Sequence, residues 1–247
     1  MEAMLIRSRY KVTHVQLAQE GYAALLAVDI ESRDKREYLL NVYEGELVKR
    51  YVACFDQLRH CPQYHGMFMD RGSLVAVFDS VEGDPIDQVF YRGAAVEWKK
   101  RVLFADQLFH LGLSLSDFPP EISCAAFLSE NLLLKPLEDR MVLRYQVAPM
   151  EGMNRREAAL LLADQAKKIL LRRFRSPDAE IAFLEGLEAQ VFLSPVELYG
   201  YWLQHRQAIT DGYQALEAKV PLQRGLYLLF RNLARGFRRL RKGKRGR

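Results

Sequence analysis

The segment Leu74-Val-Ala-Val-Phe-Asp-Ser-Val-Glu-Gly-Asp84 separates two parts of the chain that differ in their hydrophobic pattern. Before it, apolar residues alternate or run together over strand-length stretches, whereas after it they recur at helical spacing. The segment itself has the pattern of a buried strand that leads into an acidic, glycine-containing connection. This change of period predicts an α+β protein in which a sheet is followed by a mainly helical region.

Five strands and one helix are predicted before the connection. Leu47, Tyr51 and Phe55 fall at helical spacing, so residues 46–58 are expected to form an amphipathic helix. Glycine-containing turns after the first and fourth strands favour antiparallel pairing of neighbours. The strands are expected at residues 10–17, 22–30, 38–43, 64–69 and 73–78. We therefore expect a five-stranded antiparallel sheet with one helix on its face.

The region after the connection is predicted to be mainly helical. Asn154 and Glu157 have the spacing of a capping box, at the start of a helix expected over residues 154–174. Two serine–proline pairs predict a cap and first turn of further helices, at Ser176-Pro177 and Ser194-Pro195. Between the connection and Asn154, the sequence predicts a helix at residues 97–113 and two β-like segments at residues 131–134 and 141–147. The predicted parts are residues 1–82, residues 83–217 and a basic tail, residues 218–247.

This order of elements resembles the two-lobed plan of protein kinases. Leu74–Asp84 is similar to the fifth strand and hinge of a kinase, and Ser129-Glu-Asn-Leu-Leu-Leu134 resembles the end of the catalytic loop. The resemblance covers about residues 10–150 and implies a kinase-like fold with a five-stranded N-lobe. The stretch between Pro149 and the tail is shorter than the family's helical lobe, so the resemblance implies a reduced C-lobe.

The resemblance also implies where catalytic groups should stand, and three are missing. Asn41 lies at the position of the phosphate-binding lysine, and Ala126 at that of the catalytic aspartate. Tyr145 lies where the metal-binding aspartate is expected, with no acidic residue beside it. Only Asn131 is retained. Phosphoryl transfer depends on positioning and charge stabilisation, so these losses predict a pseudokinase with no nucleotide cofactor and no metal.

We therefore predict a catalytically inactive protein-interaction or scaffold module that binds another protein. The reduced form is similar to the pseudokinase subunit of bacterial type VII secretion machines. An active atypical serine/threonine kinase that binds ATP is the alternative. The sequence has no signal peptide and no membrane-spanning run, and its cysteines (Cys54, Cys61, Cys124) lack metal-ligand spacing, which favours a cytoplasmic protein with reduced thiols. His60 and His65 are interpreted as surface residues rather than metal ligands.

The tail differs from the rest of the chain in charge. Residues 224–247 hold ten of the 36 basic residues and none of the 31 acidic ones, so the preceding part has a net charge of −5. Residues 221–240 show an apolar stripe at helical spacing, and the last seven residues are expected to be disordered. The residues predicted to bind an anionic surface are Arg231, Arg235, Arg238, Arg239, Arg241, Lys242, Lys244, Arg245 and Arg247.

Two interpretations of this helix remain open. A basic amphipathic helix is typical of attachment to an anionic membrane surface, here the inner face of the membrane. The same helix can instead dock on the helical lobe and leave only its end free. Nucleic-acid binding through the tail is a further alternative, weakened by the few aromatic residues there and by the acidic body.

Overall fold

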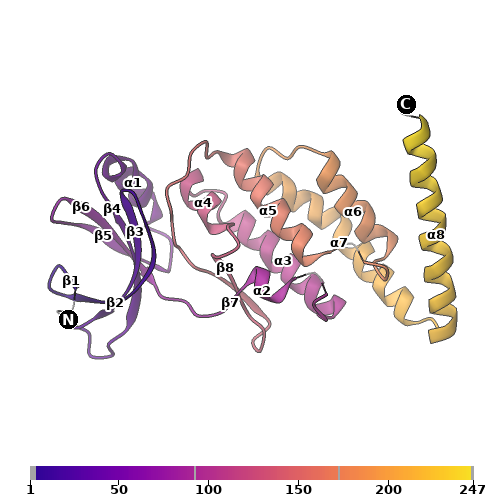
Figure 1. The fold of residues 1–247 in the computed structure, drawn as a ribbon, viewed down its shortest axis with the longest axis horizontal. Helices are drawn as coiled ribbons and strands as arrows, with labels where there is room; N and C mark the ends of the chain where they lie inside the picture. The colour runs from indigo at the N-terminus through magenta and orange to yellow at the C-terminus, as the bar shows by residue number, and fades with distance from the viewer. Residues whose placement is uncertain (1–3, 92, 172, 246–247) are drawn as a thin grey trace.

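The computed structural model describes residues 4–91, 93–171 and 173–245, with the backbone alone described for residues 236–245. In this part of the chain, six antiparallel strands form the first sheet, in the order β1-β2-β3-β4-β6-β5 (Figure 1). Their bounds are β1 (Leu5–Ile6), β2 (Tyr10–Gln19), β3 (Tyr22–Asp29), β4 (Glu37–Tyr43), β5 (Tyr64–Asp70) and β6 (Ser73–Asp79). The five predicted strands are confirmed. The short β1 was not predicted, because a strand of two residues has no alternation to detect.

One helix covers a face of this sheet, as predicted. Helix α1 (Leu47–Phe55) is followed by a 3₁₀ turn (Asp56–Leu58). Tyr51 stacks on Tyr43 of β4 with ring centroids 4.1 Å apart, and Phe55 meets Phe78 of β6 edge-on at 5.8 Å. These buried aromatic contacts fix the helix against the central strands.

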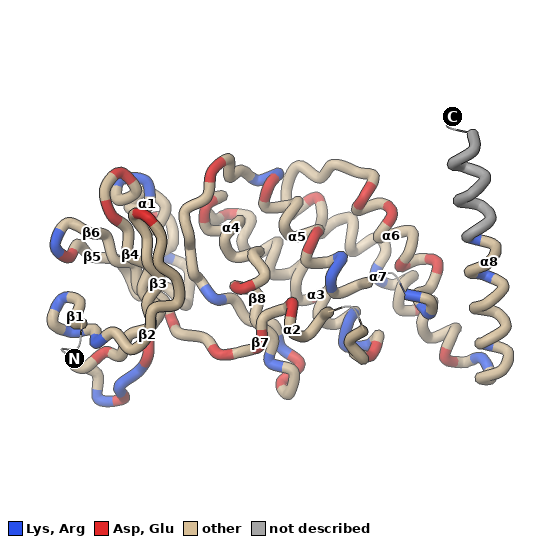
Figure 2. Tube along the Cα trace, viewed as in Figure 1, with Lys and Arg blue, Asp and Glu red and all other residues tan. Residues whose placement is uncertain are grey.

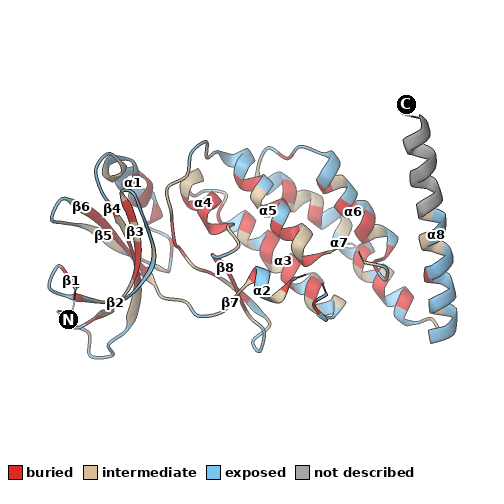
Figure 3. Cartoon of the chain, viewed as in Figure 1, coloured by how far each residue is buried: buried red, intermediate tan, exposed pale blue. Residues whose placement is uncertain are grey.

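The second lobe is mainly helical. Its helices are α2 (Ile86–Val89), α3 (Trp98–Ser114), α4 (Pro120–Ala126), α5 (Arg155–Ile169), α6 (Asp178–Ala189) and α7 (Pro195–Glu217). A second sheet joins β7 (Asp84–Pro85), β8 (Leu132–Lys135) and β9 (Arg140–Leu143). One core cluster of buried side chains extends from Tyr22 in the first sheet to Tyr213 in α7, so the two lobes are packed together (Figure 3).

Several local predictions are settled by hydrogen bonds. Asn154 and Ser194 cap α5 and α7, because their side chains accept the backbone N–H groups of Glu157 and Glu197. Ser176 was wrongly predicted as a cap: its hydroxyl accepts the N–H of Arg173 instead, and α6 begins after Pro177. Helix α5 ends at Ile169 rather than near residue 174. The second β-like segment ends at Leu143, and residues 144–147 leave the sheet.

The C-terminal helix α8 (Pro221–Arg245) lies at the end of the molecule farthest from the first sheet (Figure 1). Leu228 is buried, and Arg231 donates to the carbonyls of Phe174 and Ser176 at 3.2 and 2.8 Å. Arg235 pairs with Asp178 of α6. The helix therefore docks on the second lobe by one face, as one of the two interpretations expected.

The opposite face of α8 is not covered by the described part of the chain. Its exposed apolar residues are Leu222, Leu226, Leu229, Phe230 and Leu233. The backbone is helical to Arg245, so the expected disorder is wrong for residues 241–245, and residues 246–247 lie outside the described residues. Up to residue 235 the helix has basic but no acidic side chains, whereas both kinds are mixed over the lobes (Figure 2). None of the described helices is long and apolar enough to span a membrane.

Candidate functional site

Asn41 joins the two lobes at the place where the resemblance expects a phosphate-binding lysine. It lies in β4 with 0% of its surface exposed. Its Oδ1 accepts the hydroxyl of Tyr22 at 2.7 Å and the backbone N–H of Val147 at 2.8 Å. Its Nδ2 donates to the carbonyl of Tyr145 at 2.9 Å. These three bonds and its complete burial place the neutral amide between the lobes, and it carries no positive charge that could pair with a phosphate.

Residues 143–147 lie against the first lobe along this line of contacts. The Tyr43 hydroxyl donates to the carbonyl of Val147 at 2.7 Å, and Gln63 Nε2 donates to that of Leu143 at 3.1 Å. The Tyr145 ring stacks on Phe78 with centroids 5.2 Å apart and an interplanar angle of 13°. Burial raises the pKa of the Tyr145 hydroxyl, with a smaller contribution from Cys61, so the side chain stays neutral. This segment holds an aromatic anchor where a metal-binding acid was expected.

Ala126 and Asn131 are both buried within the second lobe. Ala126 is the last residue of α4, a helix that the sequence analysis did not predict at this position. Asn131 Nδ2 donates to the carbonyls of Ala125 and Gln146 at 2.7 and 2.9 Å. The retained asparagine therefore joins α4 to the segment that precedes Val147. Its buried Oδ1 has no hydrogen-bond partner among the described residues.

A magnesium–nucleotide complex does not fit this arrangement. Among the described residues, no group of three histidine, cysteine, aspartate or glutamate side chains could hold a metal ion. The positions at which the resemblance expects the phosphate-binding lysine, the catalytic aspartate and the metal-binding aspartate are taken by a neutral amide (Asn41), a methyl group (Ala126) and a buried tyrosine (Tyr145). Catalysis of phosphoryl transfer requires charged groups at those positions. We therefore derive no catalytic step through ATP.

A hollow of about 280 Å³ remains beside the hinge. Its acidic lining residues are Glu37 and Glu82, and Ser80 donates to the carboxylate of Glu37 at 3.1 Å. Arg144 also lines it, and burial lowers the pKa of its guanidinium. Small-molecule sites usually occupy about 300–1,000 Å³. The hollow is therefore slightly below that range, and its two carboxylates outnumber its one cation, Arg144, which disfavours a triphosphate.

The other predicted site residues divide into docked and undescribed groups. Arg231 and Arg235 bind the second lobe, so their side chains are not presented to an external surface. The side chains of Arg238, Arg239, Arg241, Lys242, Lys244 and Arg245, and all of Arg247, lie outside the described residues. All three cysteines are free and buried. His65 Nε2 contacts Asp79 at 2.6 Å.

A two-lobed body with a helix on the first sheet, a hinge after β6 and a helical second lobe defines the protein kinase fold. Solved structures agree with this class. The kinase domain of PknI from Mycobacterium tuberculosis, in the form of a double mutant, matches with a TM-score of 0.54 and 15% identity, over 86% of this chain and 98% of that chain. A second structure of the PknI kinase domain matches with a TM-score of 0.54 and 14% identity, over 85% of this chain and 98% of that chain.

Rad53 residues 1–466 in complex with AMP-PNP also match, with a TM-score of 0.54 and 14% identity, over 80% of this chain and 64% of that chain. At these identities the likeness establishes the fold alone. No protein-family model matches the sequence. No curated protein sequence matches it either. The kinase-like α+β fold predicted from the sequence is thereby confirmed.

Proposed function

We propose that this chain is a catalytically inactive protein of the kinase fold that acts by binding another protein. The observation that supports this most strongly is the amide of Asn41, which bonds Tyr22, Tyr145 and Val147 across the lobes. A lysine at this position in a kinase pairs with nucleotide phosphates. Here the position links the lobes instead, and the body becomes one rigid unit suited to presenting a surface.

One of the similar solved structures holds a nucleotide analogue, and this chain differs at the positions where a kinase acts on a nucleotide. The Rad53 structure contains AMP-PNP, a nucleotide analogue. This chain has Ala126 where a general base is needed and Tyr145 where a metal ligand is needed, and both are buried. A buried methyl group cannot accept a proton.

The proposal extends to where the protein acts. Helix α8 docks through Leu228, Arg231 and Arg235, and its outer face exposes the apolar residues Leu226, Phe230 and Leu233. An amphipathic helix with an exposed apolar face can lie in the interface of an anionic membrane, where each basic residue that is near the lipid contributes about 1 kcal/mol. In this proposal those basic residues are the ones that follow Arg235. We propose peripheral attachment at the inner membrane face. The setting that we propose is a membrane-linked assembly, as the sequence resemblance to the bacterial type VII pseudokinase subunit implies.

Thermal denaturation with and without ATP and magnesium tests the inactive assignment. A ligand stabilises the native state by an amount that grows with its concentration over Kd. We expect no change in Tm at millimolar ATP with magnesium. A metal-dependent rise of several degrees would instead support the active-kinase alternative. ADP with magnesium serves as a second ligand, since it needs the same phosphate-binding groups.

A further inference from the structure

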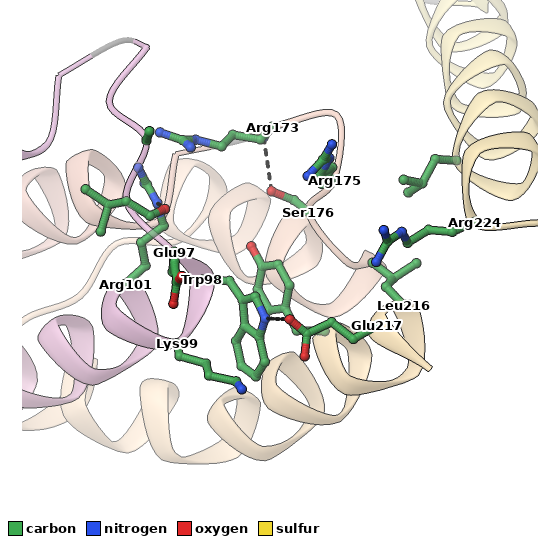
Figure 4. A pocket seen from close by; sticks show the side chains of 14 residues that line it. Glu97, Trp98, Lys99, Arg101, Arg173, Arg175, Ser176, Leu216, Glu217 and Arg224 are labelled. Atoms are coloured by element: carbon green, nitrogen blue, oxygen red, sulfur yellow. Dashed lines mark hydrogen bonds between the residues drawn. The ribbon is translucent and has the colours of Figure 1, made fainter. Parts of the chain in front are cut away.

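A hollow far from the kinase-like cleft lies where α3, α7 and α8 meet (Figure 4). Its volume is about 550 Å³. The lining comes from the start of α3, the loop before α6, the end of α7 and the start of α8. Trp98 and Tyr213 form one wall, with rings stacked 4.8 Å apart at 6°. The hollow is large enough for a small ligand.

Cationic side chains predominate around this hollow. The five cationic lining residues are Lys99, Arg101, Arg173, Arg175 and Arg224, against two acidic ones, Glu97 and Glu217. The Glu217 carboxylate accepts the indole N–H of Trp98 at 2.6 Å. Within the described part of the chain, none of the five cations has a carboxylate at ion-pair distance. The positive charge of the hollow is therefore largely uncompensated.

Arg101 is the most deeply buried of the five cationic residues, with only 2% of its surface exposed. Its guanidinium donates to three carbonyls, those of Val96, Ile169 and Ala94, at 3.0, 2.6 and 3.5 Å. Burial, followed by repulsion from Arg173, lowers its pKa to about 10. A buried charge without an opposite charge is unfavourable.

The buried carboxyl group of Glu180, next to the hollow, does not balance its positive charge. Glu180 accepts the hydroxyl of Tyr213 at 2.7 Å, and burial raises the pKa of its carboxyl group despite the attraction of Arg101 and Arg173. It forms no ion pair with either arginine among the described contacts. An anion in the hollow would therefore supply a charge that the described residues do not.

Two arginines in the hollow have guanidinium groups that are open to a ligand. Arg175 lies in the loop before α6 and Arg224 in α8, and no side-chain hydrogen bond links either to the described residues. Arg173 uses Nη2 for the carbonyl of Ala94 at 2.8 Å. Guanidinium groups bind phosphate oxygens through paired, charge-assisted hydrogen bonds. A phosphate monoester carries about −1.5 to −2 charges, which suits several converging arginines.

We propose that the hollow between α3, α7 and α8 is a binding site for a phosphate-bearing ligand, held by Arg173, Arg175 and Arg224. The proposal does not depend on the function proposed for the interlobe cleft. Since Arg224 belongs to α8 and the other two to the loop before α6, the ligand bridges the helix and the body. Bound ligand should therefore hold α8 in its docked position.

Isothermal titration of the full chain with inorganic pyrophosphate tests the site. The double variant Arg175→Ala/Arg224→Ala removes two open guanidinium groups and no side-chain hydrogen bond among the described contacts. We expect its Kd to rise at least about tenfold, because two charge-assisted contacts are lost. Arg33→Ala, an exposed arginine in the first lobe, is the matched control and should bind as the wild type does.

The source of the phosphate group is distinguished by vesicles of phosphatidylcholine with phosphatidic acid. If the site takes a lipid headgroup, the double variant should bind these vesicles more weakly than Arg33→Ala does, at equal vesicle charge. If the ligand is a soluble phosphate, the two variants should bind vesicles equally while pyrophosphate still separates them. The proposal is overturned if the wild type binds neither probe, or if the double variant binds both as well as the control.

Discussion

Replacing Asn41 with alanine should destabilise this protein more than an ordinary asparagine-to-alanine change. The substitution removes the amide that bonds Tyr22, Tyr145 and Val147 in the buried space between the lobes. Two of these partners are buried backbone groups, the carbonyl of Tyr145 and the N–H of Val147, which cannot form a hydrogen bond with water instead. An unsatisfied buried polar group costs about 1–3 kcal/mol, so three give a loss of at least about 3 kcal/mol.

Asn154→Ala provides a control with the same chemical change. Asn154 caps α5 through one bond to the N–H of Glu157, at 2.9 Å. Loss of a cap costs about 1 kcal/mol. Both variants can be measured by urea denaturation, followed by the fluorescence of the two tryptophans.

The comparison has a clear refuting result. We expect the free energy of unfolding to fall by at least about 2 kcal/mol more in Asn41→Ala than in Asn154→Ala, from the two costs above. Equal losses in the two variants would show that Asn41 does not hold the lobes together. Asn41→Lys, which introduces the residue expected here from the resemblance to kinases, should also destabilise the protein, because an ammonium group would replace the amide in a buried site.

Three further predictions concern other parts of the chain. Tyr43→Phe leaves the carbonyl of Val147 without its 2.7 Å donor and should lower the free energy of unfolding by about 1–2 kcal/mol in urea denaturation. Burial raises the pKa of Glu180, so between its unfolded and folded pKa values the folded state binds more protons than the unfolded state, and stability should fall as pH rises through that window. In Glu180→Gln the fall of Tm with pH over that window should be smaller than in the wild type, and an unchanged slope would contradict the assignment. The double variant Leu226→Gln/Phe230→Gln, on the outer face of α8, should co-sediment with anionic vesicles more weakly than the wild type. The control Leu137→Gln, at a fully exposed turn, should bind them as the wild type does. Equal vesicle binding by the wild type and both variants, or stronger competition for the tail by nucleic acid than by lipid, would contradict the membrane proposal.

The fold was predictable because its periodicities are strong. The first-lobe strands alternate or run apolar, and Leu47, Tyr51 and Phe55 mark the helix that packs on them. Helix α4 was not predicted because its short run of apolar residues follows two prolines, at 119 and 120, although a proline at the first helical position is favourable.

The candidate site was only partly predictable. Sequence comparison with the kinase pattern locates Asn41 and Tyr145 but gives no reason for those residue types. Their role depends on contacts such as Asn41 to Tyr145, separated by 104 positions in the chain. The cationic hollow was missed for the same reason, since Arg101, Arg175 and Arg224 have no common spacing and meet only through the packing of α3, α7 and α8.

Hydrogen exchange at the backbone amide of Val147, with and without ATP and magnesium, tests the central claim most directly. This N–H donates to the buried Oδ1 of Asn41 at 2.8 Å, so it should exchange as slowly as the central strands of the first sheet. Nucleotide should leave its rate unchanged, because Val147 is held to the first lobe by its bonds to Asn41 and Tyr43. Fast exchange, or a rate that changes when ATP and magnesium are added, would contradict the claim that this space is closed to nucleotide.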